Sequence, residues 1–102
     1  DDDNLRAALP WLAEQGNAEL GLRLVNALRL HWFMRGRLVE GCDWLLTMAS
    51  LPGSTAYPQL RADALINAGF IAREYGDYER AWAASREALS LTFTITKRIA
   101  DE

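Results

Sequence analysis

Three glycines divide the sequence in the same way, and the residues around them repeat. Gly16, Gly36 and Gly76 are each followed five residues later by a very small residue, and preceded four residues earlier by an apolar one. These flanking positions are Gly21, Gly41 and Ala81 after the glycines, and Leu12, Trp32 and Ala72 before them. Glycine is common just after a helix because it adopts the left-handed backbone conformation there. The spacing predicts helical hairpins in which a small residue lets two helices pack closely.

Residue usage favours helices along most of the chain. Leu and Ala each occur 16 times, against two Val and four Ile, and β-branched residues are depleted in helices. We predict helices over residues 4–15, 18–35, 38–50 and 59–75, and a fifth that runs from 78 to 91 or beyond. Residues 51–58, with the sequence LPGSTAYP, form the one predicted loop. The alternating run LTFTIT over residues 91–96 predicts either a short strand or, preferably, a fraying last helical turn.

The first predicted helix has a clear beginning and one interruption. Asn4 is a favourable N-cap, and the acidic run 1–3 before it would interact well with the helix dipole. Pro10 removes one backbone hydrogen bond, which costs about 3 kcal/mol unless the helix kinks.

Apolar spacing predicts which helix faces are buried. The second helix is apolar on several sides, since Leu22 and Leu30 lie away from its main stripe, and this is typical of a central helix. The predicted inward residues of the second helix are Leu20, Leu24, Val25, Leu28, Trp32 and Phe33. Those of the third helix are Leu38, Cys42, Leu45 and Met48. Those of the fifth helix are Tyr78, Ala81, Trp82, Ser85, Ala88 and Leu89. We also expect the four tryptophans, Trp11, Trp32, Trp44 and Trp82, to lie in the core.

The residue content argues against an active site. The chain has one histidine, His31, and one thiol, Cys42, with no recognisable third group to orient a Cys–His pair. A metal site would need carboxylates to supply most of its ligands, and no Gly-rich phosphate loop is present. We therefore expect no enzyme activity, no cofactor and no metal. The net charge of −3 also disfavours direct nucleic-acid binding, although Arg29, Arg35 and Arg37 could contact an anionic partner.

The segment from Arg61 to Leu91 resembles a tetratricopeptide repeat. The resemblance rests on Leu65, Ala68-Gly69, Gly76-Asp77-Tyr78, Ala81, Ala88-Leu89 and Leu91. It departs from the usual pattern at Ser85, where a larger residue is common, and at Phe93, where a proline usually closes the repeat. Repeats of this kind stack, so that each helix pair covers the open face of the previous one.

Most of the chain resembles the helical segment of large bacterial regulators, the MalT-like and other LuxR-type signal-transducing ATPases with an NB-ARC-like module. The matching elements are Asn4-Leu5-Arg6-Ala7-Ala8-Leu9, Arg35-Gly36-Arg37-Leu38, Glu40-Gly41 and Trp44-Leu45. The resemblance implies an all-α fold, namely a tetratricopeptide-like, right-handed α-solenoid of about five antiparallel helices forming one domain over residues 1–102. It also implies a cytoplasmic piece of a longer protein, with the ATPase before Asp1 and more repeats after Glu102.

Two surfaces are candidates for protein contact. In a tetratricopeptide stack the first helix of each pair lines the concave side, which would carry a protein-binding groove. Its predicted residues are Arg23, Asn26, Leu30, Phe33, Met34, Asp63, Ile66, Phe70, Arg73 and Glu74. The alternative is that neighbouring helices cover Leu30, Phe33, Ile66 and Phe70. The second surface is a self-association end that would form a homodimer. It comprises Leu89, Leu91, Phe93 and Ile95.

The function implied by these observations is a non-catalytic module for protein interaction and signal relay in a bacterial transcriptional regulator. Its partner would be the ATPase module of the same protein or another polypeptide, with no direct contact to nucleic acid or membrane. A free-standing tetratricopeptide adaptor that binds a separate protein is the alternative. An enzyme fragment is a third possibility with little support in the sequence.

Overall fold

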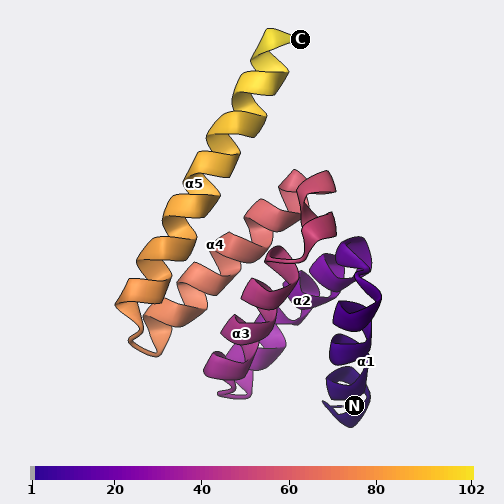
Figure 1. Ribbon diagram of the computed structural model, residues 1–102. Coiled ribbons are helices and arrows are strands. Elements are labelled where there is room, and N and C mark those ends of the chain that lie inside the picture. The colour runs from indigo at the N-terminus through magenta and orange to yellow at the C-terminus, as the bar shows by residue number, and fades with distance from the viewer. Residues whose placement is uncertain (1) are drawn as a thin grey trace.

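A computed structural model describes residues 2–102, and every regular element in that range is helical (Figure 1). There are five α-helices and one short 3-10 helix in this range, and no strand. Their bounds are α1 Asp2–Gln15, α2 Ala18–Met34, α3 Leu38–Ala49, η1 Pro52–Ala56, α4 Pro58–Glu74 and α5 Tyr78–Asp101. The prediction of an all-α chain with five helices is therefore confirmed for the described residues.

The beginning of α1 differs from the prediction. The helix includes Asp2, so Asn4 lies inside its first turn and is not the N-cap. The acidic side chains of residues 1–3 lie outside the described part of the structure. The helix α1 continues through Pro10, which has no N–H and so leaves one backbone hydrogen bond unmade.

The three glycines form the same turn three times. Gly16, Gly36 and Gly76 have φ values of +68°, +71° and +91°, the left-handed conformation that the spacing predicted. At Gly36, the N–H of Arg37 donates to Trp32 O (2.9 Å) and the N–H of Gly36 donates to Phe33 O (3.3 Å). This pair of bonds is the Schellman motif, which satisfies carbonyls at the end of a helix. The same two bonds recur at Gly16 and Gly76, so only two or three residues separate consecutive helices at each glycine.

The residue after each glycine begins the next helix. Asn17 and Asp77 act as N-caps, with side-chain oxygens that accept from Leu20 N (3.2 Å) and Arg80 N (3.1 Å). Arg37 holds the corresponding place before α3, without a side-chain cap bond. Each glycine turn thus ends one helix and positions the start of the next.

The link between α3 and α4 is longer and is not a simple loop. Most of the predicted loop folds as η1, in which Ser54 is buried and its hydroxyl donates to Ala49 O (2.9 Å). Arg61 of α4 donates from Nε to the same carbonyl (2.9 Å). These two bonds hold η1 and the start of α4 against the end of α3.

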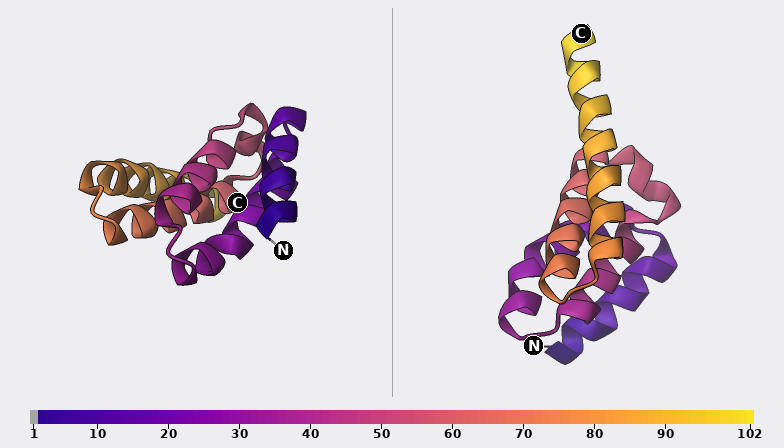
Figure 2. Two further views of the ribbon diagram at one scale, coloured as in Figure 1. Left: turned by 90° about the horizontal axis from the view of Figure 1, so that it is seen from below. Right: turned by 90° about the vertical axis from the view of Figure 1, so that its left-hand side faces the viewer.

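The last helix extends beyond Leu91, as the prediction allowed, but α5 continues through the LTFTIT run to Asp101, so a strand or a fraying turn at residues 91–96 is wrong. Within it, the Thr94 hydroxyl donates to Ser90 O (3.1 Å), a bond to the preceding turn that satisfies the hydroxyl inside a helix. The β-branched residues in this run therefore lower helix propensity without breaking the helix. The distal part of α5 projects beyond the other helices (Figures 1 and 2).

Small residues mark the closest helix contacts, as the glycine spacing predicted. A Cβ at Gly41 would lie 2.8 Å from the Trp32 ring, and one at Gly21 would lie 2.5 Å from Met48 Sδ. Trp32 and Met48 are themselves buried, so α2 and α3 pack through two reciprocal large-to-small contacts. The fully enclosed apolar side chains around them are Leu9, Leu22, Val25, Cys42, Leu45 and Ile71.

Several predicted core positions are wrong. Leu22 is fully buried, whereas Leu20 is exposed and Phe33 is 40% exposed, because α2 turns its buried side toward α3 and α4. Trp11 and Trp82 are exposed and Trp44 is half-buried, which leaves Trp32 as the one tryptophan fully in the core. On α5, alanines fill the contact with α4, so Tyr78, Ser85 and Leu89 are exposed.

Candidate protein-binding groove

An apolar groove lies between α2 and α4, which contact each other directly although α3 separates them in sequence. Its walls are Leu30 and Phe33 on α2 and Ile66 and Phe70 on α4, and we call it the α2–α4 groove. These side chains are 62%, 40%, 52% and 56% exposed, so the alternative that neighbouring helices cover them is wrong. The rings of Phe33 and Phe70 lie 5.9 Å apart with a 31° tilt, and the groove is an open cavity of about 440 Å³. Exposed aromatic and aliphatic patches of this kind are typical of interaction sites.

A polar ladder continues the groove and fixes its two walls. Asn67 Nδ2 donates to Asn26 Oδ1 (2.9 Å), and Asn26 Nδ2 donates to Leu60 O (3.2 Å). Arg29 donates from Nη1 to Asn67 Oδ1 (3.1 Å). A second cavity of about 450 Å³ adjoins this ladder and is also lined by Asp63 and Ile66. The ladder joins α2 to α4, so the spacing of the groove walls is set by hydrogen bonds within the protein.

Six of the ten residues predicted for a groove line these two cavities. Leu30, Phe33, Ile66 and Phe70 line the apolar cavity, and Asn26 and Asp63 line the polar one. The other four predicted residues line neither cavity; they are Arg23, Met34, Arg73 and Glu74. Arg23 instead forms an ion pair with Glu19 (3.3 Å) on the same helix.

Four lining residues were missed by the sequence analysis: the polar Arg29 and Asn67, and the apolar Ala27 and Ile71. The available signal for Asn67 was a polar residue next to Ile66 on a helix whose other sides are rich in Ala and Leu. Arg29 had been considered only as part of an arginine cluster with Arg35 and Arg37. The structure gives Arg29 a defined partner on α4 instead.

The predicted self-association end is divided between two sides of α5. Leu89 and Phe93 are 72% and 70% exposed, whereas Leu91 and Ile95 are half-buried on the side that continues the α4 contact. Trp82 lies on the exposed side at 63%, and the Arg86 guanidinium stacks over its ring at 4.7 Å. The exposed side of α5 is therefore a separate apolar surface that includes Trp82, which sequence reasoning had assigned to the core.

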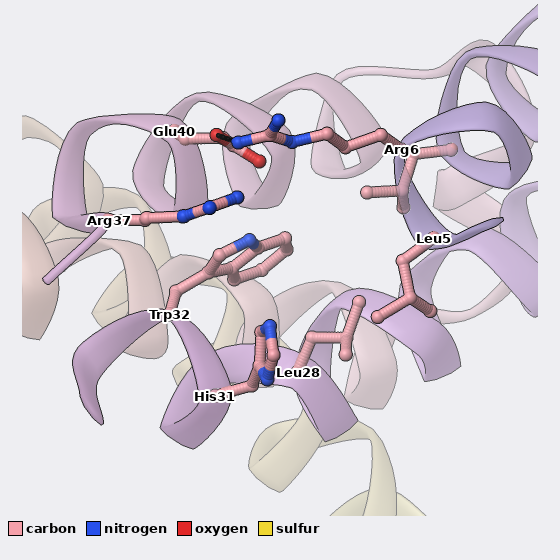
Figure 3. Close-up of a pocket in the computed structure, with 8 residues that line it drawn as sticks. Leu5, Arg6, Leu28, His31, Trp32, Arg37 and Glu40 are labelled. Carbon is pink, nitrogen blue, oxygen red and sulfur yellow. Dashed lines mark hydrogen bonds and ion pairs between the residues drawn. The ribbon is translucent and has the colours of Figure 1, made fainter. Parts of the chain in front are cut away.

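His31 borders a small pocket where α1, α2 and α3 meet (Figure 3). The cavity is about 10 Å³, about enough for one water molecule, and Trp32 closes one side of it. Arg6 of α1 and Glu40 of α3 form an ion pair across it at 3.2 Å. This site holds α1 in place and has no room for a substrate.

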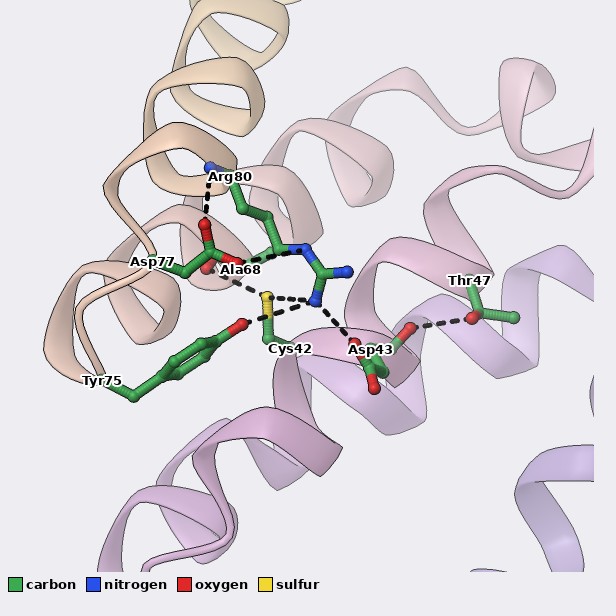
Figure 4. A network of polar contacts seen from close by, with 7 residues as sticks. All are labelled: Cys42, Asp43, Thr47, Ala68, Tyr75, Asp77 and Arg80. Atoms are coloured by element: carbon green, nitrogen blue, oxygen red, sulfur yellow. Dashed lines mark hydrogen bonds and ion pairs between the residues drawn. The ribbon is translucent and has the colours of Figure 1, made fainter.

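Cys42 lies in a different environment, in a polar network that joins α3, α4 and α5 (Figure 4). Its thiol donates to Ala68 O at 3.6 Å, and Arg80 Nη1 lies 4.0 Å from the sulfur. Arg80 also forms an ion pair with Asp43 (2.6 Å) and donates to the Tyr75 hydroxyl (3.4 Å). Cys42 is thus a buried thiol in a structural network, and the Cys–His pair considered from the sequence is not formed.

The network has electrostatic consequences for two of its members. The hydrogen bond to Asp43 raises the pKa of Arg80 further above its already high value, so the guanidinium stays charged at every relevant pH. Partial burial, followed by the contact with Cys42, raises the pKa of the Tyr75 hydroxyl, which stays protonated at neutral pH. Neither group has the titration near neutrality that general acid–base catalysis requires.

Residues 2–102 contain neither a metal-binding cluster nor a membrane-spanning helix. No group of three or more His, Cys, Asp or Glu side chains that could hold a metal ion occurs among them. No helix in the described range is long and apolar enough to span a bilayer.

Comparison with known proteins gives one partial similarity. Three mycobacterial proteins, two from strains of Mycobacterium tuberculosis and one from Mycobacterium bovis, are each 45% identical to this chain over 42 residues. All three are provisionally named as HTH-type transcriptional regulators. The match covers 41% of this chain and only 5% of the length of each relative. No family model and no solved structure matches the chain.

Proposed function

We propose that this chain is a non-catalytic segment for protein interaction and signal relay in a bacterial transcriptional regulator. The α2–α4 groove is the observation that carries this proposal, because it offers an exposed, prearranged apolar surface without catalytic groups around it. The mycobacterial relatives, which are much longer and are named as regulators, support a place within a protein of that kind.

The architecture within this proposal is a tetratricopeptide-like, right-handed solenoid in which α2–α3 and α4–α5 are successive units. Two features support it. The same three-residue glycine turn joins the helices within each pair, and α4 packs against both α2 and α3. In such a stack α2 and α4 are the first helices of their units, which places the groove on the concave side.

The signal would pass as a difference in affinity. A ligand can shift a regulator between two states only if it binds one state more tightly than the other. We propose that a protein segment, either the regulator's own ATPase module or another polypeptide, occupies the α2–α4 groove in one state and leaves it in the other. The alternative is a free-standing adaptor, which would use the same groove for a separate partner without any effect on transcription.

The test is a substitution in the groove, made in the gene that encodes this chain and followed by RNA sequencing. Phe70→Asp places a charge on the groove wall, where Phe70 is 56% exposed, so the fold should survive. We expect the transcript profile to change in the same set of genes that deletion of the whole gene affects. Met34→Asp is the matched control, because Met34 is 76% exposed on α2 and lies outside both cavities. Its profile should equal that of the wild type.

An unchanged profile for Phe70→Asp at normal protein abundance would contradict the relay function. If Phe70→Asp left the transcript profile unchanged but lost a co-purifying protein that Met34→Asp retained, the adaptor function would replace the relay function. The free energy of unfolding of the 102-residue chain distinguishes both outcomes from misfolding. Phe70→Asp should leave this free energy within about 1 kcal/mol of the wild-type value.

A further inference from the structure

We propose that the exposed side of α5 binds the same surface of a second copy of this chain, with the two helices antiparallel. The surface is a stripe of six residues along the helix, which we call the outer stripe. It comprises Trp82, Arg86, Leu89, Phe93, Thr96 and Ala100. With 3.6 residues per turn, all six fall within a sector of about 80°. This inference does not depend on the proposed function of the α2–α4 groove.

The outer stripe is free to accept another helix. The residues of α5 that pack on α4 are Ala81, Ala84 and Ala88, and they occupy roughly the opposite side of the helix. Trp82, Leu89 and Phe93 are 63%, 72% and 70% exposed. A second helix on the outer stripe would therefore bury apolar surface without displacing α4.

The stripe is self-complementary when two copies are antiparallel. A twofold axis midway between Leu89 and Phe93 places each Leu89 opposite Phe93 of the other copy. The same axis places Trp82 opposite Ala100 and Arg86 opposite Thr96. Large side chains thus face small ones at both ends, and two apolar pairs meet at the centre. A closed twofold dimer requires this kind of surface, in which one patch matches itself.

Charge and shape favour the same arrangement. From Tyr78 to Glu102 the chain has four basic residues and four acidic ones, so the net charge is 4 − 4 = 0, although the whole chain carries −3. Those charged residues are Arg80, Arg86, Lys97 and Arg98 against Glu79, Glu87, Asp101 and Glu102. Two α5 helices therefore meet without net repulsion. The distal part of α5 also projects from the body, which leaves room alongside it (Figure 2).

The exposed area sets the expected affinity. An aromatic side chain buries about 150–250 Å² when fully covered, and Trp82 and Phe93 expose about two-thirds of theirs. With Leu89, the large side chains of both copies together would bury about 600–800 Å². Stable specific interfaces bury about 1,200–2,000 Å² in total. We therefore expect a weak, reversible dimer with a Kd of about 10–100 µM.

Sedimentation equilibrium tests the dimer. The wild-type chain should associate over about 10–500 µM, and Phe93→Asp should weaken association at least tenfold, because it places two charges near the twofold axis. Met34→Asp is the matched control and should dimerise like the wild type, since Met34 is equally exposed but lies on α2. A wild-type chain that stays monomeric at 500 µM would overturn the proposal and assign the stripe to a different partner. Equal dimerisation by folded Phe93→Asp would also overturn it.

Cysteine cross-linking tests the antiparallel register. Cys42 is the native thiol and is buried, so introduced cysteines dominate oxidation. A mixture of Trp82→Cys and Ala100→Cys chains should form a disulfide between positions 82 and 100, identified by peptide mass spectrometry. Trp82→Cys alone should not cross-link, because the two sites would be about 27 Å apart along the helices. Cross-linking of Trp82→Cys with itself at the rate of the mixture would overturn the antiparallel arrangement.

Discussion

At the scale of single residues, small side chains control how closely the helices pack. Gly69 on α4 faces α5, where an added Cβ would lie 2.8 Å from Ser85 Oγ and 3.3 Å from Ala81 O. Ala81 itself is 9% exposed, and a larger side chain there would be forced toward α4. The α4–α5 contact is therefore held at short range by residues with little or no side chain on either helix.

Replacement of Ala81 tests this close contact. We expect Ala81→Leu to destabilise the chain by about 1–3 kcal/mol, because an overpacked core forces side chains and backbone to shift. Chemical denaturation followed by circular dichroism measures the change. Ala83→Leu is the matched control, since Ala83 is exposed on the same helix and should change stability by less than about 0.5 kcal/mol. If Ala81→Leu left the midpoint unchanged, the proposed role of the small residues would be wrong.

At the scale of helices, Arg80 connects elements that are distant in sequence. From α5 it reaches Asp43 on α3 and Tyr75 at the end of α4. Asp77, the N-cap of α5, lies 3.9 Å from Arg80 Nε and accepts from its backbone N–H. The turn between α4 and α5 is thereby tied to α3, in addition to the apolar packing of α3 against α4.

A double-mutant cycle measures the strength of this connection. Arg80→Ala and Asp43→Ala should each destabilise the chain, and their coupling energy should be about 0.5–1 kcal/mol. The value is modest because both side chains are more than a third exposed, at 39% and 53%, so solvent screens the pair. Urea denaturation of the four chains provides the free energies. Additive effects of the two substitutions would show that the ion pair itself contributes nothing.

The sequence predicted helices and turns well, and burial less well. Gly16, Gly36 and Gly76 act locally, so their left-handed turns could be read from the sequence alone. Burial of Leu22 rather than Leu20 depends on which direction α2 faces, and α2 contacts α3, α4 and η1 at once. When a helix is apolar on several sides, its period of 3.6 residues does not show which side is buried against the other helices. The full length of α5 was not predicted for another reason, since the β-branched residues after Leu91 favoured a strand or a fraying turn over a continuing helix.

The residues of the α2–α4 groove also differ in whether the local sequence or a distant contact determines their role. Leu30, Phe33, Ile66 and Phe70 were found because a hairpin repeat places first helices side by side, so one face of each could be deduced. Asn67 was missed because its role depends on a hydrogen bond to Asn26, which is 41 residues away in sequence. Trp82 was misassigned because Ala81, Ala84 and Ala88 already fill the α4 contact, which periodicity alone does not reveal.

At the scale of the whole molecule, the chain has apolar surfaces and structural ion pairs but no assembled reactive site in its described part. We expect the 102-residue chain neither to bind ATP nor to hydrolyse it, and not to bind duplex DNA at physiological salt. Isothermal titration with MgATP, a phosphate-release assay and fluorescence anisotropy with labelled DNA provide the measurements. Micromolar DNA affinity that persists at 150 mM salt would contradict a pure protein-contact role. The relay proposal also requires a Gly-x-x-x-x-Gly-Lys-Ser/Thr sequence earlier in the parent gene.

Because α5 is much longer than α4, a small rotation near its beginning would move its far end by a large distance. At 24 residues it is about 36 Å long, whereas its partner α4, with 17 residues, is about 25 Å long. The distal part of α5 extends beyond the body (Figure 1), and a three-residue turn joins the helix to α4. A rotation of only about 10° at Gly76 would displace the far end by about 6 Å, given that length. A small tilt between neighbouring helices would thus become a displacement larger than one helical turn, so a fluorescent or spin label at Ala100 would detect rearrangements too small to resolve near the core.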